Sequence, residues 1–275
     1  MAATTKSAYV GRMESMTEGR IATDRAILRV TGPDARDFLQ GLVTNDVRRL
    51  DDGAVYAALL TPQGKYLFDF FLIPEGNAVV VDVKADRAAA LAQRLGIYRL
   101  RAKVTVEPTG RSVVVGAGEM PSGAMVDPRD PAIGWRAWPE DPAAFLVGFS
   151  ALDPAAWEAR RIALGVPETG VELLPEDSYI LEMGFERLNG VDFRKGCYVG
   201  QEVTARMKHK TELKKGLARV RVEGEPPPPG TAITAGDRVA GTLYSTAEGR
   251  GLAHLRFDRA EGELAAGAAL ISVLR

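Results

Sequence analysis

The sequence is poor in the residues that disulfide-bonded and zinc-binding proteins depend on. It holds one cysteine, Cys197, and two histidines in 275 residues. A single cysteine excludes an intrachain disulfide and indicates a reducing compartment. The histidines, His209 and His254, lie far apart, and no HExxH or CxxC spacing occurs. We therefore expect no zinc site built from this chain alone.

Long apolar runs and an excess of one charge are also absent. No apolar stretch approaches the roughly 18 residues of a membrane span. The first twenty residues show no secretory signal, and Glu14 and Glu18 are atypical of a transit peptide. Lys and Arg number 35 against 36 Asp and Glu, so no global basic field would recruit nucleic acid or a membrane. We expect a soluble, cytoplasmic protein.

Common nucleotide and hydrolase motifs are missing as well. GAGEMP (116–121) begins like a dinucleotide-binding loop, but Pro121 occupies the third glycine position. VGFSAL (147–152) lacks the second glycine of a nucleophile elbow, and no Walker motif occurs. These absences argue against the usual dehydrogenase, hydrolase and kinase chemistries.

What is present predicts an α+β fold in three regions. In the first, residues 1–108, short apolar runs that flank turn residues predict strands, and apolar residues at helical spacing predict helices. This order is typical of an antiparallel sheet with helices on one face. The expected strands are 26–32, 54–60, 65–73, 78–83 and 102–108, and the expected helices 33–47 and 86–98.

The second and third regions have different patterns. Residues 109–214 include a helix at 153–165, with Asp153 as its capping candidate and Gly165 at its end. Residues 215–275 contain short strand patterns joined by glycine turns, which predict a small β-barrel.

Asp69 is the first candidate functional group. Strand alternation in KYLFDFFLI places it on one face between Leu67 and Phe71, with Lys65 and Ile73. A buried carboxylate there needs a hydrogen-bond donor, a cation or a ligand. The alternative is an edge strand on which Asp69 reaches water.

Glu182 and Tyr56 are further candidates. Glu182 lies between Leu181 and Met183, with Tyr179 one helical turn earlier. It could accept two parallel N–H bonds from a heterocycle, or form a structural ion pair with a nearby arginine. Tyr56 could line the same pocket or belong to the core.

A basic run follows in RMKHKTELKKG (206–216). Such a run is typical of a solvated face, and the functional alternative is attraction of a polyanion such as a polyglutamate tail, a phosphate or RNA. Its basic residues are Arg206, Lys208, Lys210, Lys214 and Lys215.

The lone thiol lies in KGCYVGQE (195–202). Its flanking glycines permit close backbone approach, and the cations Arg194 and Lys195 would favour a reactive thiolate. The alternative is a small buried apolar residue beside a turn.

Four stretches of the sequence carry a resemblance to a known family. They are KGCYVGQE, VTGPDARDFLQGLVTNDV (30–47), DPRDPAIGWR (127–136) and GRGLAHLR (249–256). With these stretches the chain resembles the YgfZ family of folate-binding proteins, relatives of the glycine-cleavage T-protein, an aminomethyltransferase. KGCYVGQE is the hallmark of the YgfZ branch. The motif residues that the resemblance marks are Lys195, Gly196, Cys197, Tyr198, Gly200, Gln201, Glu202 and Arg206.

The resemblance implies two α+β lobes and a C-terminal β-barrel around a central folate channel. It also implies that Tyr56, Asp69 and Glu182 bind tetrahydrofolate or a one-carbon derivative. Phe68 stands where T-proteins often have a second Asp, and Asp82 stands where they have a folate-contacting asparagine.

The YgfZ family is implicated in iron–sulfur cluster assembly and repair, which implies an iron–sulfur carrier or client enzyme as partner. One cysteine cannot supply the usual four thiolates of a cluster, so Cys197 would share a transient cluster with another protein. A redox-sensitive thiol and a structural turn are the alternatives. Cys197 and Asp69 are the expected catalytic groups. The rival function is a folate-dependent one-carbon transferase, which rests on Asp69, whereas KGCYVGQE favours the assembly role.

Overall fold

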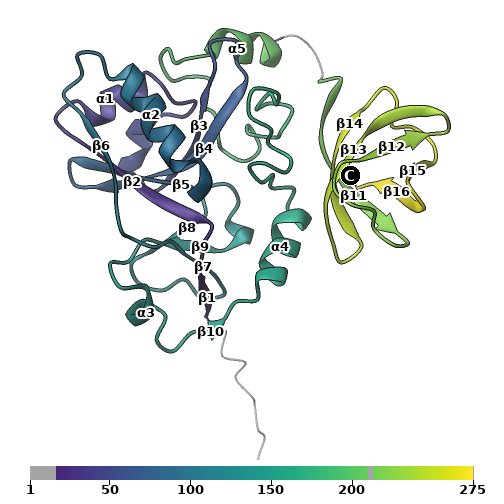
Figure 1. Cartoon of the computed structure of the whole chain (residues 1–275), viewed down its shortest axis with the longest axis horizontal. Helices are drawn as coiled ribbons and strands as arrows, with labels where there is room; N and C mark the ends of the chain where they lie inside the picture. Colours follow the sequence, from purple (N-terminus) through teal and green to yellow (C-terminus); the bar gives the residue numbers. More distant parts are fainter. Residues whose placement is uncertain (1–16, 210–212, 275) are drawn as a thin grey trace, which may run out of the picture.

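Two five-stranded, mainly antiparallel sheets form the body of the molecule, and a barrel lies beside it (Figure 1). The computed structural model describes residues 17–209 and 213–274. The first sheet has the strand order β3 (Val55–Leu60), β4 (Tyr66–Glu75), β5 (Ala78–Lys84), β2 (Arg25–Thr31) and β6 (Thr105–Pro108). The second has the order β10 (Ser150–Ala151), β1 (Glu18–Ile21), β7 (Val114–Ala117), β9 (Trp135–Ala137) and β8 (Ala124–Val126). Its β1–β10 pair is parallel.

Helices cover one face of the first sheet. Apolar residues of α1 (Ala35–Gln40) and α2 (Ala88–Tyr98), such as Leu39 and Leu91, join a buried cluster with that face. The expected helix over 33–47 is too long, because the chain turns after Gln40 to bring Val43 into a bridge with Leu59 of β3. The short 3-10 helix η1 (Val47–Asp51) follows.

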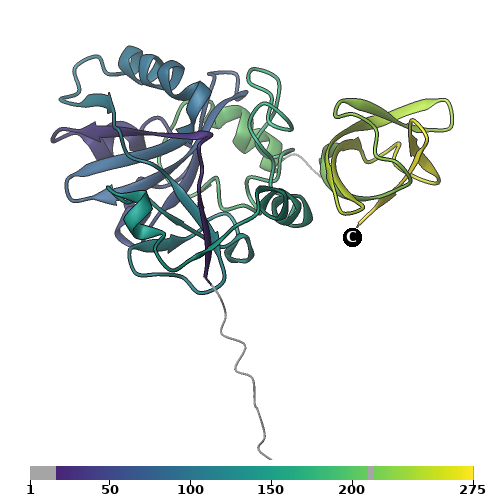
Figure 2. The same ribbon diagram turned by 60° about the horizontal axis from the view of Figure 1, so that its bottom comes forward.

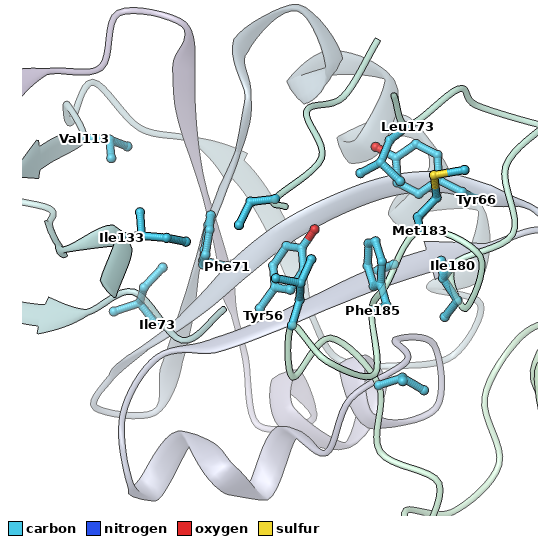
Figure 3. Packing of buried hydrophobic residues seen from close by; sticks show 14 of the residues in the cluster. Tyr56, Tyr66, Phe71, Ile73, Val113, Ile133, Leu173, Ile180, Met183 and Phe185 are labelled. Atoms are coloured by element: carbon cyan, nitrogen blue, oxygen red, sulfur yellow. The ribbon is translucent and has the colours of Figure 1, made fainter. Parts of the chain in front are cut away.

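A second core lies between the two sheets. It joins Phe71 and Ile73 of the first sheet to Val115 of the second, and it takes in residues of the 166–198 segment. The ring of Tyr56 lies 5.3 Å from that of Phe71 and 5.1 Å from that of Phe185 (Figure 3). Residues 179–190, where the sequence suggests a helix around Glu182, form successive turns and no helix.

The remaining helices and the barrel follow in the second half. The helices are α3 (Pro142–Phe145), α4 (Pro154–Ala163) and α5 (Gln201–His209), with the 3-10 helices η2 (Ala85–Arg87) and η3 (Pro131–Ile133) elsewhere in the body. The Asp153 side chain accepts from the Ala155 N–H at 3.0 Å, which confirms the expected cap of α4. Of the described helices, none is long and apolar enough to cross a membrane.

Six strands close into a barrel, seen nearly end-on in Figure 2. Around the barrel they are β11 (Lys215–Glu223), β14 (Arg250–Arg256), β13 (Arg238–Ala247), β12 (Thr231–Ala235), β15 (Leu264–Ala266) and β16 (Ala269–Val273). The barrel has its own core, and α4 packs against β13 and β14. The expected α+β class with a C-terminal barrel is confirmed. The strand β1, at residues 18–21, pairs with β7 of the second region.

Candidate functional site

Asp69 lies in the interior of the body, where three hydroxyl groups hold its carboxylate. Tyr56 Oη donates to Oδ2 at 3.0 Å and Tyr66 Oη to Oδ1 at 2.8 Å, and Thr169 Oγ1 also donates to Oδ1. Burial and the adjacent Asp69 raise the pKa of both tyrosines well above the usual value, so both hydroxyls keep their protons. Tyr56, Tyr66 and Thr169 form what we call the hydroxyl cage.

The strand that carries Asp69 differs from the expectation in two ways. β4 lies between β3 and β5, and Asp69 is 5% exposed, so the edge-strand alternative is wrong. The register shifts where Leu60 pairs with Tyr66, which leaves Leu67 as an extra residue. Leu67 therefore packs on the helix-covered face, and Tyr66 shares the inner face with Phe71.

A ladder of alternating charges runs beside Asp69 and links the two sheets. Arg25 Nε lies 2.6 Å from Asp82 Oδ1, and Arg136 bridges Asp82 at 3.1 Å and Asp127 at 2.9 Å. Arg129 completes the series at 2.8 Å from Asp127. Although burial opposes it, Arg129 and Arg136 hold the pKa of Asp127 well below its usual range. These five residues are the charge ladder.

The ladder gives structural meaning to two features of the sequence. DPRDPAIGWR (127–136) supplies Asp127, Arg129 and Arg136, and its two arginines stack over Phe71 at 4.8 Å and 3.9 Å. Asp82 is fully buried and also accepts from Trp138 Nε1 at 3.1 Å, so its carboxylate is occupied by protein groups. Phe68 packs in the helix-covered core on the other face of the sheet.

A cavity of about 470 Å³ opens in front of Asp69 and the ladder. Its walls come from all three regions: Asp69 from the first, Arg136 and Trp157 from the second, and Ser245 from the barrel. Its volume falls within the range of roughly 300–1,000 Å³ that is usual for small-molecule sites. Tyr56 lies behind Asp69 and is fully buried.

Glu182 lies at the junction with the barrel. Its Oε2 is 3.4 Å from Lys215 Nζ of β11 and 3.4 Å from His254 Nε2 of β14. The alternative of a structural ion pair with a nearby arginine is wrong in its partner, since the described contacts of Glu182 are with these two barrel residues. Glu182 is buried, and it is not part of the wall of the 470 Å³ cavity. Tyr56 and Asp69 are thus brought into contact, and Glu182 stands apart from them.

Lys195 anchors the loop that carries the KGCYVGQE motif. Its side chain is buried, and Nζ donates to the carbonyl oxygens of Gln40 at 2.8 Å, Val43 at 2.5 Å and Asn45 at 3.0 Å. Burial lowers the pKa of Lys195 to about 8, so the ammonium keeps its charge at neutral pH. The lysine therefore ties the motif to the segment after α1, and its charge is directed away from solvent.

The end of the motif is fixed by close backbone packing. Gly200 has φ +83°, and a Cβ there would lie 2.5 Å from the Thr61 carbonyl oxygen in the β3–β4 turn. Gly64, in the same turn, has φ +75°, and a Cβ there would lie 2.8 Å from Val203 Cβ. Both positions favour glycine. Tyr198 is buried between these two anchors, and burial raises its pKa to about 12.

Cys197 itself is free and exposed, so the alternative of a buried apolar cysteine is wrong. Gly196 beside it has no heavy atom within 4 Å of where a Cβ would lie. Within residues 17–209 and 213–274, no His, Cys, Asp and Glu side chains gather in threes as possible metal ligands. The motif thus presents a thiol to solvent between buried neighbours, Lys195 and Tyr198.

The remaining motif and basic residues lie on the outside. Glu202 and Arg206 are exposed on α5, and Gln201 is half-buried at its start. Lys208 pairs with Glu186, and Lys215 approaches Glu182, so part of the basic run is engaged in ion pairs. Lys210 lies outside the described residues.

Residues 214–275 match the family model described as the CAF17 C-terminal beta-barrel domain. The iron–sulfur cluster assembly factor IBA57, mitochondrial, of Mus musculus is 33% identical over 278 residues, covering 87% of this chain and 78% of the relative. The protein of the same name from Homo sapiens is 33% identical over 276 residues, with the same coverage. The chain belongs to the IBA57 family.

One further relative carries the same family name, and one solved structure shares the fold. The IBA57 homolog of Neurospora crassa is 32% identical over 227 residues, covering 71% of this chain and 51% of the relative. The crystal structure of the glycine cleavage system aminomethyltransferase T from Bartonella henselae superposes with a TM-score of 0.77 at 14% identity, covering 95% of this chain and 85% of that chain. This superposition confirms the T-protein-like fold of this IBA57 family member.

Proposed function

We propose that this chain is an iron–sulfur cluster assembly factor, as its relatives in the IBA57 family are named, and that Cys197 is its working thiol. The observation that carries the proposal is the exposed thiol on a loop anchored by the buried Lys195 and the close-packed Gly200. Such a loop offers the sulfur to a partner without a change in the body. The KGCYVGQE motif is the reason to assign the chain to the YgfZ branch.

The sulfur would serve as a ligand shared with a second protein. Iron–sulfur clusters usually require four thiolate ligands, and this chain has one cysteine. An iron–sulfur carrier or a client enzyme would therefore supply the other ligands of a transient cluster. The exposure of Cys197 suits both this role and that of a redox-sensitive thiol.

A rescue assay tests the assembly role. A strain that lacks the gene for this protein should lose activity of its iron–sulfur enzymes, and the wild-type chain should restore it. We expect Cys197→Ala to fail, and the exposed barrel substitution Arg221→Ala to succeed. Full rescue by Cys197→Ala, with protein levels equal, would remove the thiol from the function.

We also propose that the 470 Å³ cavity binds tetrahydrofolate or a one-carbon derivative. A reduced pterin presents N–H donors, and Asp69 is a carboxylate acceptor in the cavity wall. The hydroxyl cage holds this carboxylate in one orientation, and the arginines and Trp157 supply flat surfaces for a ring system. Glu182 would join this site if its carboxylate left Lys215 and His254.

Calorimetric titration with tetrahydrofolate tests the cavity assignment. Asp69→Asn and Glu182→Ala should each weaken binding, with Arg221→Ala as the control. Unchanged affinity in Asp69→Asn would contradict the cavity assignment. If Asp69→Asn weakens tetrahydrofolate binding and Glu182→Ala does not, Glu182 serves only to join the body to the barrel.

A folate-dependent one-carbon transferase is the second candidate function, and the buried Asp69 is the observation in its favour. Asp69 would hydrogen-bond the reduced folate near its reactive nitrogens. Incubation with methylene-tetrahydrofolate and candidate amines or thiols should then yield a product, and Asp69→Asn should abolish it. No product from wild-type protein that binds the folate would leave the assembly role as the function.

A further inference from the structure

Among the described residues, the cationic side chains around the cavity form ion pairs, with one exception. Six cations line it, and five of them form ion pairs with carboxylates in or behind the wall. The pairs are Arg25 with Asp82, Lys84 with Asp24 and Glu168, Arg129 with Asp127, Arg136 with Asp82 and Asp127, and Arg161 with Glu158 and Glu172. The sixth is Arg20.

Arg20 lies on β1 and is half-buried in the cavity wall. Its Nη1 makes one long contact, 3.5 Å to the Ile21 carbonyl oxygen, and its Nε is buried without a hydrogen-bond partner among the described residues. A buried N–H that lacks an acceptor is unfavourable, because it has lost its hydrogen bonds to water. The guanidinium therefore has donors to offer to a group inside the cavity.

Asp69, in the same cavity, is a carboxylate without a cationic partner among the described residues. It accepts hydrogen bonds from the neutral hydroxyl cage, and no ion pair of the described residues includes it. The cavity thus holds one carboxylate and one guanidinium without a charged partner. Since ion pairs elsewhere in the wall are complete, a ligand that satisfies both groups would complete the site.

We infer that the cavity takes a ligand with N–H donors at one end and an anionic group at the other, and that Arg20 binds the anion. Guanidinium binds carboxylate and phosphate through two parallel N–H bonds, so both anions suit Arg20. The inference deepens the proposed function and rests on it for the choice of a reduced folate as the probe. The acidic tail of the folate would then be the anionic end.

The test compares tetrahydrofolate with its α,γ-diamide, whose tail has the same length but no charge, by calorimetric titration of the full chain. The wild-type protein should bind the acid about tenfold more tightly than the diamide, which corresponds to one charged hydrogen-bonded contact. Arg20→Gln should abolish this preference and leave the affinity for the diamide unchanged. Arg20→Lys should keep part of the preference, and the exposed Arg221→Gln all of it.

The outcomes separate this inference from the proposed folate function. An equal preference in wild type and Arg20→Gln, or no preference in wild type, overturns the role of Arg20 even if folate binds. If neither folate binds, the proposed folate function fails, and p-aminobenzoylglutamate and inorganic phosphate become the probes. Arg20-dependent binding of one of them supports the anion site and identifies the anion; no binding of either overturns it.

Discussion

Gly200→Ala should destabilise the protein because two independent costs add at this position. At φ +83° an alanine pays the left-handed penalty of about 1–2 kcal/mol. A Cβ 2.5 Å from the Thr61 carbonyl oxygen and 3.1 Å from Gly64 Cα meets backbone, so the turn must shift, for about 1–3 kcal/mol more. The expected loss in the free energy of unfolding is about 2–5 kcal/mol, or roughly 5–15 °C in Tm.

Urea unfolding followed by tryptophan fluorescence measures this loss. All three tryptophans, Trp135, Trp138 and Trp157, lie in the body, so the signal reports the part that holds the motif. Gly196→Ala is the matched control, because a Cβ there has no neighbour within 4 Å. It should change the free energy of unfolding by less than about 1 kcal/mol. Equal stability of Gly200→Ala and wild type would refute the steric reasoning.

Three more predictions concern stability. Cys197→Ala should leave the free energy of unfolding within about 0.5 kcal/mol of wild type, measured in urea, because the thiol is exposed. Arg161→Met should cost about 3–5 kcal/mol, since it leaves the buried Glu172 without its cation. The double variant with Glu172→Met should recover only part of the loss, because the Glu168 and Ser245 N–H groups then lack an acceptor. A hydrogen bond from Arg48 lowers the pKa of Asp46 from 3.8 to about 2, so its stabilisation is complete above pH 4 and lost as the pH falls through 2. The urea midpoint of Asp46→Asn should therefore fall less between pH 4 and pH 2 than that of the wild type. An equal fall in both proteins would contradict this.

Much of the fold could be predicted because its signals are local. The apolar runs in 54–60, 65–73 and 78–83 and the cap at Asp153 depend on neighbouring residues, and the structure has strands and a helix there. The helix expected over 33–47 failed because its second half pairs with β3, a contact between segments that periodicity does not encode. The extra residue at Leu67 was missed for the same reason.

Some residues around Asp69 could be identified from the sequence, and others could not because folding brings them there. The resemblance singled out Tyr56 and Asp69, which are in contact. Tyr66 and Thr169 were missed: Tyr66 is only three residues from Asp69, but the bulge was needed to turn it inward, and Thr169 is distant in sequence.

The charges followed a similar pattern. Lys195 was expected to act on the thiol, but its ammonium binds carbonyl groups about 150 residues away in the chain. The charge ladder joins Arg25 to Arg129 across two sheets, and only the topology brings these residues together.

The proposed role of Cys197 predicts that this thiol brings the chain into a cluster shared with a second protein. The purified chain would be mixed with a cluster-loaded iron–sulfur carrier under anaerobic conditions, and the complex would be isolated by size-exclusion chromatography and its visible absorbance recorded. We predict that the complex isolated with the wild-type chain carries iron–sulfur absorbance, and that Cys197→Ala yields no iron–sulfur absorbance. A lower absorbance with Gly196→Ala would indicate that the partner approaches the backbone beside Cys197. A complex of equal absorbance with Cys197→Ala, or no complex with wild type, would show that Cys197 is not a ligand of a shared cluster.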